Sequence, residues 1–321
     1  MNFENLSETE RYDVLAEITN MYYNQGKTQQ EIAAHFSTNR FKIARCLQEA
    51  RDENVVEIKI NYSQNRNRKM EDELLKYLPL QKAYVLNTQY LPFIEGIKQL
   101  GKLLADYLVR EVQPNQAIGL TWGKTVYSAI SQLNPPVHQP VRIFQLAGNT
   151  PLLNPSIDSL HLVRAFASAY SGTFRNIYAP LYIHDPQVRD GLLKEPLIAN
   201  ILYESRYLDF VITGIGGQSS LPLNQPVWKP YLTEKDVRLK SHCIGSIYGY
   251  VLNENGEPAE IDLNRKVIAM PLENIKRTKH KILIVYGRHK AGIAFHVIRQ
   301  HLVNELFTDI DTATAILEQQ L

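Results

Sequence analysis

The sequence is poor in the residues that build disulfide, metal and membrane sites. Its 321 residues include only two cysteines, Cys46 and Cys243, and their separation fits neither a zinc-ligand motif nor a redox motif. No apolar run approaches the ~20 residues of a membrane-spanning helix, and the acidic first ten residues lack the layout of a signal peptide. We therefore expect a cytoplasmic protein with reduced cysteines, no metal site and no cofactor.

Neither positive nor negative charge is in large excess. The chain has 35 Lys and Arg residues against 33 Asp and Glu residues, a formal net charge of +2. This balance identifies no partner, so a surface that binds nucleic acid would have to be a local basic patch. The hydrophobic content of 44% is ordinary for a globular protein, and the length fits one small domain and one large domain.

The pattern of the chain changes near residue 54. Residues 8–53 show helical periodicity, whereas β-rich runs alternate with helical runs from residue 55 onward. That alternation predicts a mostly parallel sheet covered by helices. The polar segment 63–69 is the candidate boundary. We therefore expect a helical domain at 1–62, a linker and connecting helix at 63–80, and an α/β domain at 81–321.

Three short helices are predicted in the first domain. Gly26 is placed to end the first helix in a left-handed turn. Residues 28–31 read Thr-Gln-Gln-Glu, a capping box that opens the second helix. Residues 37–39 separate it from a third helix, and residues 55–60 alternate like a short strand. The order predicts a helix-turn-helix domain of winged-helix-like type.

This order of helices is typical of proteins that place one helix in the major groove of DNA. Arginine can bind guanine through two hydrogen bonds, and asparagine or glutamine can bind adenine in the same way. Side chains at the start of the second helix commonly hold phosphates. The candidate DNA-binding residues are Thr28, Gln29, Gln30, Thr38, Asn39, Arg40, Lys42 and Arg45. The alternative is a solvated face, which a surplus of acids in residues 1–58 favours.

In the larger part we expect a doubly wound α/β sheet. The pattern predicts strands near 83–86, 117–120, 141–146, 210–213, 242–252, 267–271 and 281–286. It predicts helices near 94–110, 124–133, 159–170 and 291–301, and a hairpin turn at 253–256.

Small and polar residues follow four of these strands. They occur at residues 119–125, 145–150, 214–217 and 286–292. Open α/β sheets bind ligands beyond the carboxyl ends of their strands, where exposed backbone amides can hold an anion. One such junction is often needed only for turn geometry, but four at one edge predict a ligand pocket.

The motifs together resemble the SorC family of sugar-responsive bacterial regulators. In the first domain the resemblance lies in residues 22–33, 39–51 and 55–58. In the larger part it lies in residues 119–125, 145–148, 179–181, 214–216 and 290–291, so that it covers nearly the whole chain. The family usually has Ser at the position of Asn39 and Gly at the position of Ser37.

The resemblance implies a transcriptional regulator of carbohydrate genes that binds operator DNA and a small phosphorylated sugar. It also implies a homotetramer and an effector domain with the fold of sugar-phosphate isomerases and CoA transferases. The candidate effector-binding residues are Thr121, Gly123, Lys124, Thr125, Gly148, Asn149, Gly214, Gly216, Ser246 and Lys290. Family members that bind sugar phosphates commonly have an acidic residue where this chain has Ser246, and a hydroxyl cannot replace the two acceptor oxygens of a carboxylate. We therefore expect a different sugar or a different binding mode.

Two other functions remain open from the sequence. A sugar-phosphate isomerase needs a positioned general base, but Asp185 and Asp190 read as surface carboxylates, and the histidines lack metal-ligand spacing. We therefore predict no catalytic residues and no enzyme. A DNA-binding protein whose large domain serves only for assembly is the third reading, and Ser246 keeps it open.

Overall fold

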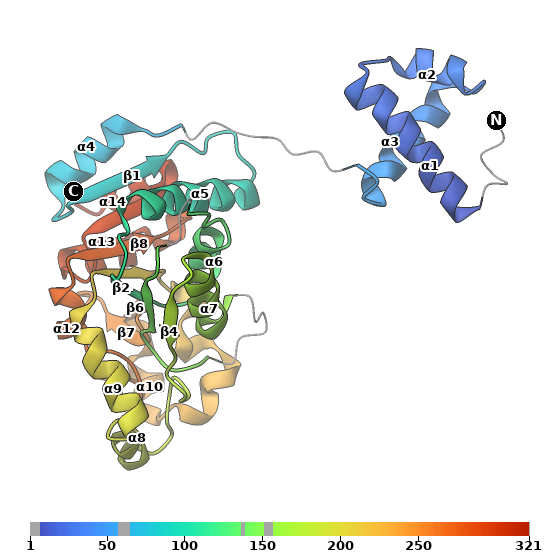
Figure 1. Cartoon of the computed structure of the whole chain (residues 1–321). Coiled ribbons are helices and arrows are strands. Elements are labelled where there is room, and N and C mark those ends of the chain that lie inside the picture. The colour runs from blue at the N-terminus through green and yellow to red at the C-terminus, as the bar shows by residue number, and fades with distance from the viewer. Residues whose placement is uncertain (1–6, 57–64, 136–138, 151–156, 321) are drawn as a thin grey trace. The chain divides into compact units, whose positions relative to one another are not determined.

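The computed structural model describes residues 7–56, 65–135, 139–150 and 157–320. The chain divides into two compact units, residues 1–63 and residues 64–321. Each unit has its own hydrophobic core. In Figure 1 the first unit is blue, and the colour of the larger unit runs from cyan to red.

The first unit is helical. Its elements are α1 (Glu8–Thr19), a π-helical turn (Asn20–Asn24), α2 (Gln29–His35) and α3 (Arg40–Asp52). Thr28 caps α2 with the predicted capping box, since its hydroxyl and the Glu31 carboxylate each accept a backbone N–H of the other residue. Gly26 has a φ of 68°, as the predicted left-handed turn requires. The buried side chains are Val14, Leu15, Ile18, Met21, Ile32, Ala33, Phe36, Ile43, Cys46, Leu47 and Ala50.

The turn between α2 and α3 is a Schellman motif with serine in the left-handed position. Ser37 has a φ of 48°. Its amide donates to Ala34 O at 3.2 Å, and the amide of Thr38 donates to Ala33 O at 2.8 Å. The turn therefore forms without the glycine that usually occupies this position.

Only the first two residues of the expected strand at 55–60 can be compared with the structure. Val55 and Val56 form a bend, not a strand, and pack against the helical core. Residues 57–60 lie outside the described residues.

The larger unit contains a seven-stranded sheet in which every pair of neighbouring strands is parallel. The strand order is β1-β9-β8-β5-β2-β3-β4. The strands are β1 (Lys82–Leu86), β2 (Ala117–Leu120), β3 (Arg142–Gln145), β4 (Thr173–Arg175), β5 (Phe210–Thr213), β8 (His280–Ile284) and β9 (Glu305–Asp309). The predicted α/β class is confirmed.

Helices cover both faces of this sheet (Figure 1). One face packs on α5 (Phe93–Glu111), α6 (Lys124–Ile130) and α7 (Ser159–Ala169). The other packs on α4 (Arg68–Tyr77), α9 (Pro196–Glu204), α12 (Leu272–Arg277), α13 (Ala291–Arg299) and α14 (Ile310–Glu318). Three further helices, α8 (Pro186–Leu192), α10 (Glu234–Leu239) and α11 (Asp262–Arg265), lie in the connections.

Several predicted elements differ from the structure. The run 242–252 is not one strand but a hairpin of β6 (Cys243–Ile247) and β7 (Tyr250–Asn253), which reverses at Tyr248 and Gly249 with φ of 55° and 90°. The run 267–271 forms only isolated bridges. The chain does turn at 253–256, but the returning segment contributes one bridge, between Leu252 and Pro258. Strands β4 and β9 and helices α8, α9, α10, α11, α12 and α14 were not predicted.

The sheet reverses its strand order between β2 and β5. After β2 the chain moves outward to β3 and β4, and after β5 it moves the other way to β8 and β9. In open α/β sheets the carboxyl ends of the two strands at such a reversal border a crevice, and ligands bind there. The fold therefore directs attention to the loops that follow β2, β5 and β8.

Candidate nucleic-acid interface and effector site

Helix α3 presents a polar face away from the core of the first unit. Ile43, Cys46, Leu47 and Ala50 are buried along one side of the helix. The predicted Arg40 and Arg45 are exposed, and Lys42 is half-buried on the flank that faces α1. No acidic residue lies in the first turn of α3. The start of this helix is therefore a local basic patch in a nearly neutral chain.

Some predicted DNA-binding side chains already have partners inside the unit. The Asn39 Oδ1 atom accepts the amide of Lys42 at 2.9 Å and caps α3. The Thr28 hydroxyl is used in the capping box of α2. One of the two acceptor positions of the Asn39 oxygen is therefore used within the helix. Gln30 is exposed, whereas Gln29 and Thr38 are half-buried.

Sequence reasoning missed Phe41 and Gln48 on the same helix. Both are exposed, and the Phe41 ring is 69% exposed. The Arg40 guanidinium carbon lies 4.9 Å from the centre of this ring. Phe41 also lines a cavity of about 480 Å³ between α1 and α3, together with Arg11, Lys42, Arg45 and Glu49 among others. The available signal was an aromatic residue at a position outside the apolar stripe of the helix.

The loops after β2 and β5 lie against each other at the carboxyl edge of the sheet. Gly123 starts α6 with a φ of 123°. A Cβ atom at Gly214 would lie 3.3 Å from the Thr125 hydroxyl. Gly216 exchanges two backbone hydrogen bonds with Ser246, at 2.9 and 2.8 Å. The structure therefore brings these predicted residues into one neighbourhood.

Lys290 joins this neighbourhood from the loop after β8. A Cβ atom at Gly217 would lie 3.7 Å from the Lys290 side chain. Burial and the positive charge of Lys124 lower the pKa of Lys290, while the carboxylate of Asp309 acts in the opposite direction. Neither lysine takes part in an ion pair among the described residues. Two ammonium groups that repel each other beside small-residue loops are suited to bind an anion.

Asp309 holds the loop that carries Lys290, a role that sequence reasoning missed. Its buried carboxylate accepts the Gly287 amide at 3.0 Å and the Thr312 hydroxyl at 2.5 Å. Gly287, with a φ of 105°, allows the chain to turn directly after β8. This arrangement fixes the path of the loop before Lys290 leaves it.

Other predicted effector residues serve the fold in this structure. Gly148 packs so closely on the carbonyl oxygen of Pro180 that an added Cβ would lie 2.4 Å from it. The Asn149 side chain accepts from Gln145 Nε2 at 2.8 Å and donates to Ile177 O. No described contact joins these two residues to the lysine pair.

The two threonines of the loop after β2 also bond within the protein. The hydroxyls of Thr121 and Thr213 lie 3.0 Å apart, and both side chains are buried. Thr125 donates its hydroxyl to Ile284 O at 3.1 Å. Each hydroxyl oxygen still has a lone pair with which it can accept a hydrogen bond.

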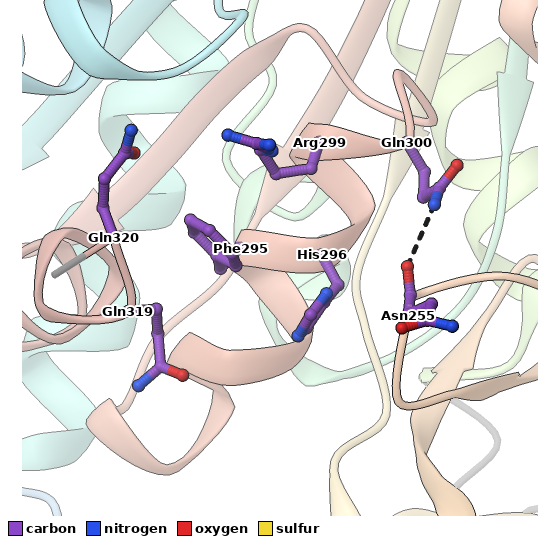
Figure 2. A pocket seen from close by; sticks show the side chains of 7 residues that line it. All are labelled: Asn255, Phe295, His296, Arg299, Gln300, Gln319 and Gln320. Carbon is purple, nitrogen blue, oxygen red and sulfur yellow. Dashed lines mark hydrogen bonds between the residues drawn. The ribbon is translucent and has the colours of Figure 1, made fainter.

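A second concave site lies at the far end of α13 (Figure 2). This cavity of about 510 Å³ has a polar lining of Asn255, Phe295, His296, Arg299, Gln300, Gln319 and Gln320. The Gln300 amide donates to Asn255 O at 3.0 Å. Because α13 has nine residues, its last turn begins about 9 Å and ends about 13 Å along the helix from Lys290, and none of the predicted effector residues lines this cavity. The cavity is therefore separate from the carboxyl-edge site.

The carboxylates considered for catalysis have local structural roles. Asp185 caps α8 by accepting the Gln187 amide at 2.7 Å. Asp190 accepts from Arg189 at 2.8 Å and is exposed. Among the described residues, no group of three His, Cys, Asp or Glu side chains is arranged to hold a metal ion. No helix in the described ranges is long and apolar enough to span a membrane.

Comparison with known proteins settles the family. A family profile described as "Putative sugar-binding domain" matches residues 62–318. The chain belongs to this family. The sorbitol operon regulator of Klebsiella pneumoniae is 24% identical over 309 residues, which cover 95% of this chain and 98% of the relative. The transcriptional regulator LsrR of Enterobacter sp. (strain 638) is 25% identical, over 98% of this chain and 95% of the relative.

Comparison with solved structures agrees on the fold. The crystal structure of the full-length sorbitol operon regulator SorC from Klebsiella pneumoniae has a TM-score of 0.70 and 23% identity. The match covers 95% of this chain and 99% of that one. The resemblance to SorC regulators predicted from the motifs is thereby confirmed.

Proposed function

We propose that this protein is a DNA-binding transcriptional regulator of carbohydrate genes, controlled by a small phosphorylated sugar. The observation that carries the proposal is the convergence of the loops after β2, β5 and β8 at the reversal point of the sheet, where the positive charge of Lys124 lowers the pKa of Lys290. The sugar-binding-domain family and relatives named as regulators support the general function. The phosphate follows from the chemistry of the site.

A phosphate monoester suits this site better than a neutral sugar does. At neutral pH it carries between one and two negative charges, so it would relieve the repulsion between the two lysines. The backbone amides in the first turn of α6, after Gly123, supply further hydrogen bonds to the phosphate. The Thr125 hydroxyl, which donates to Ile284 O, can accept a hydrogen bond from a hydroxyl of the sugar. Ser246, which stands beside Gly216, offers one hydroxyl to the sugar where a carboxylate would offer two acceptor oxygens.

The helical unit supplies the DNA contact in this proposal. The start of α3 enters the major groove with Arg40, Lys42 and Arg45, and the start of α2 faces the phosphate backbone. One such unit makes too few contacts for tight specific binding, so an oligomer, a tetramer by resemblance, presents several units to repeated half-sites. Effector binding changes operator affinity if the two arrangements of the oligomer bind the effector unequally.

We further propose that the protein acts in the cytoplasm and is not an enzyme. The Asp309 carboxylate accepts hydrogen bonds from Gly287 and Thr312. It therefore has a structural role and is not placed as a general base. An isomerase would need such a base next to the substrate carbon. A large unit that serves only for assembly is disfavoured because nothing in assembly requires two lysines to be held together.

A thermal-shift screen with sugar phosphates and their unphosphorylated parents tests the effector site. A ligand that binds only the folded protein raises its melting temperature. We expect one phosphorylated sugar to do so in the wild type and in Lys69→Met, which removes an exposed lysine on α4. The shift should be lost in Lys124→Met and in Lys290→Met. A shift that persists in both variants would remove the lysine pair from the proposal.

Operator binding by the purified chain tests the DNA-binding part of the proposal. Binding to a selected duplex should weaken in Arg40→Ala and Arg45→Ala, with the helical circular dichroism unchanged. The effector found in the screen should then change the affinity for that duplex. Failure of the effector to alter DNA affinity would contradict the regulatory link while leaving both binding sites in place.

A further inference from the structure

Phe41 is the most exposed large apolar side chain among the described residues of the helical unit. Its ring is 69% exposed, compared with 51% for Tyr12 and 37% for Tyr23. Burial of a phenylalanine side chain is favourable because it removes apolar surface from water. The ring is thus an unused apolar contact on a face whose other side chains are polar.

The ring lies in the first turn of α3, on the face that carries the arginines. Phe41 and Arg45 are four residues apart and therefore neighbours along the helix surface, and Gln48 continues the same face one turn further. The Arg40 guanidinium lies 4.9 Å from the ring centre on the other flank. An apolar group is therefore bracketed by two side chains of the kind that bind guanine and phosphate.

The major groove contains one apolar group that such a ring can recognise. Thymine carries a C5-methyl group there, and cytosine, adenine and guanine do not. We infer that Phe41 contacts the methyl group of a thymine in each operator half-site and is a specificity-determining residue. This inference rests on the proposed DNA binding and adds the base that the aromatic residue selects.

The Arg40 contact gives the ring a defined position. A cation over an exposed aromatic ring is attracted to it, and this attraction favours the ring position in which the two side chains are in contact. The guanidinium covers part of the ring, and the rest remains available to a methyl group. Arg45, one turn away on the same face, would reach a base pair close to that thymine.

Replacing single thymines with deoxyuridine tests this contact, because the change removes only the methyl group and keeps base pairing. The full-length wild type first selects an operator from a random duplex library. Each thymine of that operator is then replaced in turn, and affinity is measured by fluorescence anisotropy. We expect one position per half-site at which wild-type affinity falls about fourfold, the value for one buried methyl group.

In Phe41→Ala the same replacement should have no effect, because the ring that senses the methyl group is gone. The variant should also bind the thymine operator more weakly than wild type does. Tyr12→Ala, which removes the exposed ring on α1, should keep the fourfold discrimination. Phe41→Leu should retain part of it, and circular dichroism establishes that each variant keeps its helices.

Three results would overturn the inference. Wild type with equal affinity for every deoxyuridine operator would show that no thymine methyl is read. Discrimination preserved in Phe41→Ala would assign the methyl contact to another side chain. A changed oligomeric state in Phe41→Ala, with discrimination intact, would assign the ring to a contact between subunits. If no operator is selected at all, the proposed DNA binding itself fails, which is a different outcome from these three.

Discussion

Replacing Ser37 with glycine is expected to stabilise the turn between α2 and α3. The serine has a φ of 48° and ends α2 in a Schellman motif. An L-residue in the left-handed region has its Cβ too close to the backbone, which costs about 1–2 kcal/mol. Glycine has no Cβ and adopts this conformation without that cost.

The net gain is smaller than the strain that the substitution removes. Glycine is more flexible in the unfolded chain, and this offsets about 0.5–1 kcal/mol. We therefore expect Ser37→Gly to stabilise the motif by about 0.5–1 kcal/mol, a factor of about two to five in an opening equilibrium. Neither hydrogen bond of the motif uses the serine side chain, since both donors are backbone amides.

Native-state hydrogen exchange of the full-length chain measures this gain directly. The amides of Ser37 and Thr38 donate the two bonds of the motif, so their exchange reports its opening. Exchange of these amides should slow two- to fivefold in Ser37→Gly. Amides in the sheet of the larger unit, such as those of β5, provide an internal reference that should not change.

Gly26→Ala is the matched control variant, and it is expected to destabilise its turn. Gly26 has a φ of 68°, and a Cβ added there would meet nothing within 4 Å. The substitution therefore introduces only backbone strain, and exchange at the nearby amides should accelerate. Unchanged or faster exchange in Ser37→Gly, together with the expected acceleration in Gly26→Ala, would refute the reasoning about Ser37.

Three further substitutions test the larger unit. Lys290→Met should raise the melting temperature of the ligand-free protein at pH 7. The lowered pKa of Lys290 means that its charge destabilises the fold, and this penalty disappears as the pH rises toward 10.5. Glu305→Gln should destabilise the fold by about 2 kcal/mol in urea unfolding, because the fully buried carboxylate accepts the Tyr107 hydroxyl at 2.7 Å. Gly148→Ala should also unfold at lower urea, since its Cβ would lie 2.4 Å from Pro180 O.

Local signals in the sequence were sufficient for the helical unit. The capping box at Thr28, the left-handed Gly26 and the buried stripe of α3 all depend on residues within one or two turns of each other. Phe41 was overlooked because an apolar residue near an apolar stripe is usually interpreted as core. Only the register of the helix shows that it points outward.

Long-range contacts explain what was missed in the larger unit. Strand β9 begins with Glu305 and ends with Asp309. Acidic residues at both ends of a segment do not predict a buried strand. Glu305 is buried because Tyr107, 198 positions away in the chain, donates to it. The hairpin of β6 and β7 turns at Tyr248, a residue with no preference for a φ of 55°. No local window contains these reasons.

The lysine pair is an intermediate case. Each lysine stood out from its own small-residue junction, but their proximity depends on the order β8-β5-β2, which places the three loops at adjacent positions along one edge. Gly148 and Asn149 follow the next strand in this order, β3. They contact residues 177–180 and do not take part in the lysine site. The sequence identified the edge, and the topology selected the part of it that can hold an anion.

The lowered pKa of Lys290 also gives the effector site a characteristic dependence on pH. Free protein begins to lose the Lys290 proton below the ordinary pH range of lysine, because burial and Lys124 both disfavour the charge. A bound phosphate favours the charged form, so binding at alkaline pH must take up a proton, and affinity must fall as the pH rises through the lowered pKa.

Calorimetric titration with the sugar phosphate from the screen, in two buffers of different ionisation enthalpy, counts that proton. We expect no uptake attributable to lysine near pH 7 and a growing uptake as the pH rises, present in Lys69→Met. Lys124→Arg keeps the neighbouring charge and should keep both binding and the uptake. Lys124→Gln removes a cation that the phosphate needs, so it should give no heat of binding at any pH, in line with Lys124→Met. Binding by the glutamine variant with the affinity and proton uptake of wild type would mean that Lys290 does not sense Lys124, and the two lysines would then not share one anion.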